Sequence, residues 1–171
     1  MPKIAKKIFV ASSTEDIWAT LSAFGDIGQW AQNVSHSCLL TEQKKGVGAI
    51  RRIQQGNKTL TEEVTAWQNL SSLVYEINGL PPVFKSVTNT WLISPQENGT
   101  EVNLEIEILP QRRPATPVAV LACILVSRFN HAMLSNLKDF LENIKPINSL
   151  REEVALLTSR LLQLDEGNDP L

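Results

Sequence analysis

Six short segments of alternating apolar and polar residues follow one another between residues 37 and 109, with no helical segment between them. Turn signals such as Gly56-Asn57 and Asn98-Gly99 separate them. Strands joined by short turns pair with their sequence neighbours in antiparallel order. The pattern therefore predicts an antiparallel meander, with strands over 37–43, 48–55, 60–67, 73–78, 86–94 and 101–109.

A strand and two short helices are predicted before the meander. Residues 6–11 have the composition of a strand, and Ser12 or Ser13, with an acidic residue three positions later, is a helix N-cap signal. The first helix is expected to end at about Ala23. A second short helix is expected around residues 27–31.

Prolines mark a break in the meander and the start of a long helix. Pro81 and Pro82 cannot lie in a central strand, so a loop carrying Val83 and Phe84 is expected there. After the last strand, a threonine followed by a proline begins a predicted helix over 117–143, in which apolar residues recur every three or four positions.

The chain length suits one domain with an appendage. We expect a domain over residues 1–145, followed over 146–171 by an additional amphipathic helix and a disordered tail. The apolar residues of that helix span about two heptads, which is too short for a stable isolated helix. It either packs on its own domain or pairs with a second copy through residues 149–164.

Two opposite charges fall on the face of the meander that should be buried. Arg51 follows Ala49 on that face, and Glu62 precedes Val64, whereas Trp67 is expected on the opposite face. A buried charge must be paired or must face a wet cavity. Arg51 and Glu62 therefore either orient a ligand in an inner cavity or form a cross-strand ion pair that holds register and binds nothing.

Further candidate ligand-binding residues lie on the same face and on the long helix. Asn89 precedes Trp91 on the inner face, so its amide needs a partner. Tyr75 and Trp91 either fill the core or contact a ligand. Phe129 and Met133 of the long helix would reach into the same cavity.

Little in the sequence indicates a metal site or nucleic-acid binding. The net charge is −2 without a large basic patch, so nucleic acid is not an expected partner. Cys38 and Cys123 have no metal or redox spacing and are expected to be buried free thiols. His36 and His131 cannot complete a metal cluster with them, and His131 is expected to face solvent.

The sequence also lacks the usual signatures of a catalytic or cofactor site. The GVG at 46–48 lacks the third glycine of a dinucleotide loop, and no nucleophile elbow is present. We expect no cofactor, and the catalytic residues of an enzyme with this sequence stay unknown. The N-terminus lacks a signal-peptide core and the apolar run at 117–126 is too short to span a bilayer, so a cytoplasmic protein is expected.

Five segments carry a family resemblance: IFVASSTEDIWATLSAFGDIGQW, GVGAIRRI, TEEVTAWQNLSSLVYEI, NGT and LSNLKDFLENI. In this order, over about residues 3–145, they resemble the bacterial polyketide cyclase/dehydrase-like branch of the START-like (SRPBCC, Bet v 1-like) superfamily. The resemblance implies an α+β helix-grip fold, in which a curved antiparallel sheet of about seven strands wraps a long C-terminal helix around a mostly apolar cavity. Gly46, Gly48 and Arg51 match the family's G-x-G-A-x-R segment, and Glu62 matches the acidic residue that often follows it.

The resemblance implies that the protein binds a small hydrophobic or amphipathic ligand, of lipid, polyketide or isoprenoid type. One alternative is a cyclase, dehydratase or aromatase, with Glu62 or Tyr75 transferring a proton and Arg51 stabilising an enolate. Another is a regulatory or assembly module that acts through the C-terminal helix.

Overall fold

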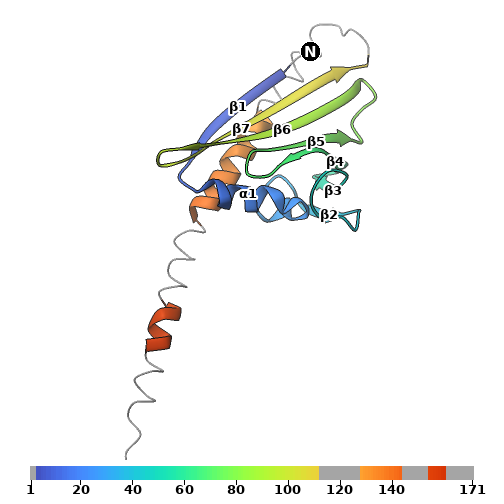
Figure 1. The fold of residues 1–171 in the computed structure, drawn as a ribbon. Helices are drawn as coiled ribbons and strands as arrows, with labels where there is room; N and C mark the ends of the chain where they lie inside the picture. The colour runs from blue at the N-terminus through green and yellow to red at the C-terminus, as the bar shows by residue number, and fades with distance from the viewer. Residues whose placement is uncertain (1–2, 112–127, 144–153, 161–171) are drawn as a thin grey trace, which may run out of the picture.

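A computed structural model describes residues 3–111, 128–143 and 154–160 of the chain. The strands are β1 (Lys3–Val10), β2 (His36–Leu39), β3 (Ile50–Gln55), β4 (Lys58–Gln68), β5 (Ser72–Asn78), β6 (Phe84–Gln96) and β7 (Gly99–Pro110). They form one curved antiparallel sheet in the order β1-β7-β6-β5-β4-β3-β2 (Figure 1). The predicted meander and helix-grip architecture are thereby confirmed.

The ends of several strands differ from the prediction. β3 begins at Ile50, two residues late, because Gly46 and Gly48 before it have φ angles of 88° and 89°, which strands do not use. Phe84 was predicted in a loop, but it is the first residue of β6, where it pairs with Pro110. The two prolines before it still form a turn.

A bulge in β4 corrects the predicted face of Trp67. The register with β5 shifts between Val64 and Ala66, so the alternation of sides changes by one residue there. Trp67 therefore lies opposite Leu73 and packs against the buried core, with its ring centroid 5.0 Å from that of Trp18. The sequence pattern had placed Trp67 on the outer face.

Two short helices follow β1. The helix α1 (Thr14–Ser22) begins after Ser13, whose Oγ accepts a hydrogen bond from the backbone N–H of Asp16 at 3.1 Å, as the N-cap signal predicted. The second is a 3₁₀ helix, η1 (Phe24–Gln29), which begins and ends earlier than the range 27–31 predicted from the sequence.

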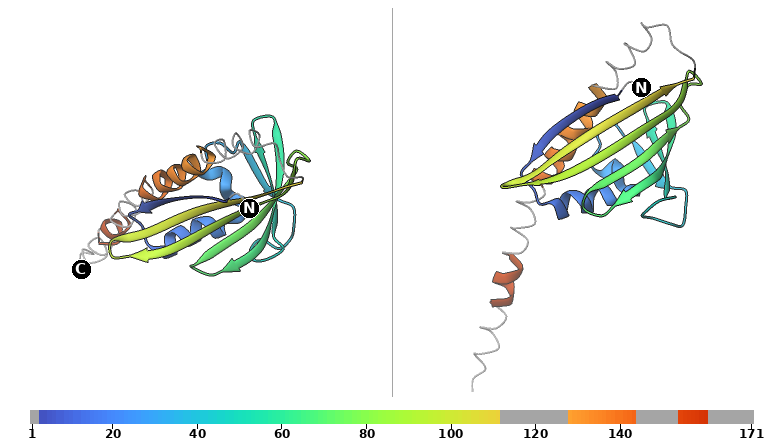
Figure 2. Two further views of the ribbon diagram at one scale, coloured as in Figure 1. Left: turned by 90° about the horizontal axis from the view of Figure 1, so that it is seen from above. Right: turned by 45° about the horizontal axis from the view of Figure 1, so that its top comes forward.

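Helical residues 128–143 belong to the predicted long helix. In both views of Figure 2 this helix, drawn in orange, runs alongside β1. Its end is joined to the β1–α1 connection, because the backbone N–H of Ala11 donates to Oε1 of Glu142 at 3.1 Å. The predicted first part of the helix, Cys123 and the predicted tail lie outside the described residues.

Residues 154–160 are also helical, and all seven are exposed. They fall within the additional helix that the sequence predicted. The proposed domain boundary near residue 145 lies outside the described residues. None of the helices in the described ranges is long and apolar enough to cross a membrane.

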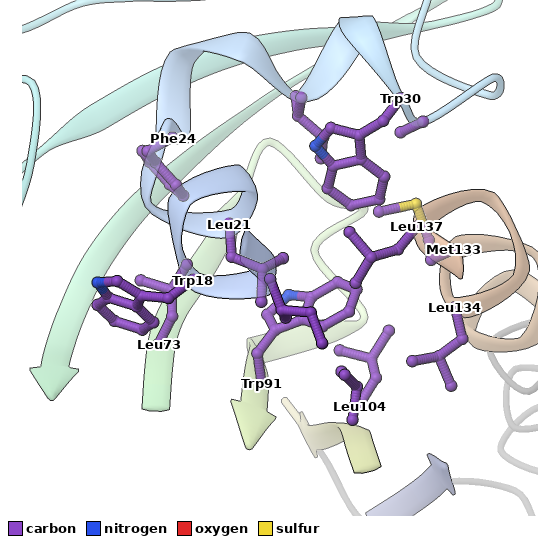
Figure 3. Close-up of a cluster of buried hydrophobic side chains, with 14 of the residues drawn as sticks. Trp18, Leu21, Phe24, Trp30, Leu73, Trp91, Leu104, Met133, Leu134 and Leu137 are labelled. Carbon is purple, nitrogen blue, oxygen red and sulfur yellow. The ribbon is translucent and has the colours of Figure 1, made fainter. Parts of the chain in front are cut away.

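The core lies on one face of the sheet, beneath α1, Trp30 and helix 128–143 (Figure 3). Trp91 of β6 is 1% exposed and lies among side chains from all three, while Leu104 of β7 lies between it and the helix. The fully buried face of the helix does not include Phe129, which was expected to reach into the cavity, because Phe129 is only half-buried. Its buried residues are Asn130, Met133, Leu134, Leu137 and Leu141.

Candidate functional site

Arg51 and Glu62 form an ion pair inside the sheet. They lie directly opposite each other on β3 and β4, and Nε of Arg51 is 2.5 Å from Oε2 of Glu62. The two residues are only 3% and 4% exposed, so neither charge is screened by bulk water. The cross-strand ion pair that the sequence allowed is therefore formed.

Arg51 also ties the sheet to the helical layer. Its Nη1 donates to the backbone carbonyl of Phe24 at 2.6 Å, at the start of η1. The guanidinium carbon lies 3.9 Å from the ring centroid of Phe24 and 5.1 Å from that of Tyr75. The buried positive charge of Arg51 is therefore stabilised by a carboxylate, a carbonyl and two aromatic rings.

Tyr75 is the centre of a second buried polar group. It lies opposite Asn89 on neighbouring strands, and its hydroxyl accepts hydrogen bonds from Nδ2 of Asn89 at 3.0 Å and Nε1 of Trp91 at 3.2 Å. Burial raises the pKa of Tyr75, and the negative charge of Glu62 raises it further against the opposing effect of Arg51 and the two hydrogen bonds. Tyr75 therefore keeps its proton at neutral pH and can act as a hydrogen-bond donor.

Two buried side-chain amides have an unused oxygen. Asn89 and Asn130 are 1% and 0% exposed, and the Oδ1 atom of each has no hydrogen-bond partner in the part of the chain that the structure describes. Nδ2 of Asn130 donates to the carbonyl of Leu104 at 3.4 Å. A buried amide oxygen without a partner is costly, so each of these two atoms is a candidate acceptor for a hydrogen-bond donor on a ligand.

A small cavity lies next to both polar groups. Its volume is about 10 Å³, close to the space of a single water molecule. Its walls come from α1, η1 and the strands β3, β5 and β6. The residues around it are Thr20, Leu21, Ala23, Ile27, Trp30, Arg51, Leu73, Tyr75 and Trp91.

The structure brings most of the candidate residues together. Arg51, Tyr75 and Trp91 line this cavity. Asn89 does not line it but is hydrogen-bonded to the hydroxyl of Tyr75. Met133 is 1% exposed and lies near Trp30 in the core (Figure 3).

Phe129 is half-buried and packs against both apolar clusters of the interior. Asn130 was not among the residues predicted from the sequence. Its signal was available, because residues 130, 134, 137 and 141 follow the spacing of a buried helix face.

The remaining candidates lie apart from this site. His36 and His131 are both exposed, as expected for His131. Cys38 is a free thiol but is only half-buried, so the prediction of a buried thiol was wrong for it, because β2 is the edge strand of the sheet. Within residues 3–111, 128–143 and 154–160, no three histidine, cysteine, aspartate or glutamate side chains come together to hold a metal ion.

Solved structures with the same fold cover most of the chain at low sequence identity. A START superfamily protein from Mycobacterium smegmatis is 14% identical, with a TM-score of 0.68 over 83% of this chain and 98% of its own. Ara h 8.0201 is 9% identical, with a TM-score of 0.68 over 83% of this chain and 98% of its own. The di-domain ARO/CYC protein StfQ of the steffimycin biosynthetic pathway is 13% identical, with a TM-score of 0.71 over 84% of this chain and 51% of its own.

Identities this low establish the fold alone. The comparison with curated proteins gives no match. A family model described as "Polyketide cyclase / dehydrase and lipid transport" matches residues 1–142. Since this match spans most of the chain, and the helix-grip sheet agrees with it, the protein belongs to the polyketide cyclase/dehydrase and lipid transport family and has its hydrophobic ligand-binding fold.

Proposed function

We propose that this protein binds a small hydrophobic or amphipathic molecule, of lipid, polyketide or isoprenoid type, between the sheet and helix 128–143. The observation that carries the proposal is a cavity between α1, η1 and the sheet, in a mostly apolar interior that helix 128–143 also covers, with Arg51 and Tyr75 in its wall beside Trp91. Ligand sites combine apolar walls with a few polar groups in this way. Buried apolar area would supply the affinity, and Tyr75 and Asn89 would orient the ligand.

The described residues supply the polar end of such a site rather than its full volume. Small-molecule sites occupy about 300–1,000 Å³, whereas the cavity measures about 10 Å³. Binding therefore needs side chains such as Leu21 and Trp30 to move apart.

The geometry favours binding over proton-transfer catalysis. The carboxylate of Glu62 is already paired with Arg51 at 2.5 Å, so it is not a free base. Tyr75 has a raised pKa and keeps its proton, which also argues against it as a base.

Native mass spectrometry of the purified protein, compared with the denatured protein, tests the proposal. We expect an additional mass that is lost on denaturation. Ala23 lines the cavity, so Ala23→Leu should fill it and abolish the additional mass. Ala19→Leu on the exposed face of α1 is the matched control and should retain it. A wild-type protein that carries no additional mass, and that no apolar compound stabilises in thermal unfolding, would overturn the proposal.

A second candidate function is supported by the C-terminal helix. Val154, Leu156 and Leu157 are 62%, 54% and 52% exposed, and exposed apolar side chains at helical spacing favour a partner. We propose that residues 149–164 pair with a second copy of the chain. Light scattering after size-exclusion chromatography should give a dimer for the full chain and a monomer for a chain ending at residue 145, and a full chain that is monomeric at high concentration would refute the pairing.

A further inference from the structure

The buried polar residues form a boundary between two apolar clusters. Tyr75 and Asn89 lie side by side on β5 and β6. Trp91, two residues after Asn89 on β6, belongs to the main core. Val87, two residues before Asn89, belongs to a smaller cluster with Ile106 and Ile108 of β7. A molecule lying along this face would therefore have apolar surroundings at both ends and a polar group near its middle.

The amide of Asn89 has one unused end whichever way it is oriented. As placed, Nδ2 donates to the Tyr75 hydroxyl and Oδ1 has no partner. With the amide turned over, Oδ1 would accept from that hydroxyl and Nδ2 would have no partner. A hydroxyl group satisfies both cases, because it can donate one hydrogen bond and accept others.

No positive charge in the described part of this interior is free to hold an anion. Among the described residues, the only charged side chains in the buried core are Arg51 and Glu62, and they neutralise each other at 2.5 Å. A carboxylate ligand that took Arg51 would leave Glu62 buried without its counter-ion, which is strongly unfavourable.

We propose that the ligand is a neutral apolar molecule carrying a hydroxyl group, and that this hydroxyl binds at the amide of Asn89 between the two apolar clusters. The proposal rests on the function proposed above and narrows its ligand class. Asn130 contributes a second amide oxygen without a partner, which suits a ligand with a further donor on the side of the helix.

Three probes of equal ring size test this: 2-naphthol, naphthalene and 2-naphthoate. Affinities are measured by calorimetry at neutral pH, where the first two are neutral and the third is an anion. We expect 2-naphthol to bind about tenfold more tightly than naphthalene, which is the size of one net hydrogen bond. It should also bind more tightly than 2-naphthoate.

The variant Asn89→Leu should remove the advantage of 2-naphthol over naphthalene while naphthalene still binds. The matched control is Asn103→Leu, which changes a half-buried asparagine of β7 that is hydrogen-bonded to Glu105, and it should leave the advantage intact. The wild-type preference is informative even if a variant fails to fold.

The outcomes separate the two proposals. Equal affinity for 2-naphthol and naphthalene, or the tightest binding by 2-naphthoate, would overturn the hydroxyl assignment and leave apolar ligand binding in place. An advantage that persists in a folded Asn89→Leu variant would overturn the role of Asn89. If none of the three probes binds, the hydroxyl assignment is overturned, and apolar ligand binding fails as well if the protein carries no additional mass and no apolar compound stabilises it.

Discussion

Removing the negative charge of Glu62 should destabilise the fold severely. In the variant Glu62→Gln the guanidinium of Arg51, which is 3% exposed, would lose the carboxylate that lies 2.5 Å from it. Breaking a buried pair by removing one partner costs about 3–5 kcal/mol. This is a large part of a total unfolding free energy of about 5–15 kcal/mol.

Urea unfolding followed by tryptophan fluorescence measures this loss, because Trp18, Trp30 and Trp91 are all buried. We expect the unfolding midpoint to fall without a change in the denaturant slope. The exposed cross-strand pair of Lys7 and Glu101, at 3.0 Å, provides the control. Glu101→Gln should cost less than about 1 kcal/mol.

The double variant Arg51→Met with Glu62→Leu tests whether the loss in Glu62→Gln comes from an unpaired buried charge. It removes both charges, so we expect it to be more stable than Glu62→Gln alone. It should still be less stable than the natural protein by about 1–3 kcal/mol, because the buried carbonyl of Phe24 loses its donor. A loss of stability in Glu62→Gln no larger than that in Glu101→Gln would refute a buried, mutually dependent ion pair.

Three further predictions concern single positions. Tyr75 is the single tyrosine, so near-ultraviolet titration of tyrosinate should show a pKa above the ordinary value of about 10 in the folded protein and a return to it in urea. Between the ordinary pKa and the raised one, the folded state retains a proton that the unfolded state loses, so stability should fall as pH rises through this range, and Tyr75→Phe should weaken this fall. Ionisation near the ordinary value in the folded state would contradict it. Gly99→Ala should cost more than about 1 kcal/mol in urea unfolding, because its Cβ would overlap the carbonyl oxygen of Val10, and a neutral result would show that the turn adjusts. Leu137→Ala, at a position that is 0% exposed, should cost about 2–5 kcal/mol in thermal unfolding, and a loss below about 1 kcal/mol would show that the helix is not packed there.

The sequence determined the strands and the inward side of most of them. Alternation with a period of two, interrupted by glycine and asparagine turns, specified an antiparallel meander because side chains alternate across a strand. The same pattern placed Arg51, Glu62 and Tyr75 on the inner face, where all three are buried. Only the structure revealed the bulge after Val64, since an extra residue in one strand is defined by the pairing of two.

The choice between an ion pair and a ligand anchor also required the structure. The face of a side chain follows from its own strand, whereas its partner depends on the register between strands and on how the helices pack above them. Arg51 bonds both Glu62, eleven residues away, and the carbonyl of Phe24, twenty-seven residues away. Asn130 came within reach of Leu104 only through the docking of helix 128–143 on the sheet. Periodicity along the strands thus determined that Arg51, Glu62, Tyr75 and Asn89 are buried, and the tertiary structure decided which buried polar groups are satisfied, because hydrogen-bond partners are set by distances between segments remote in sequence.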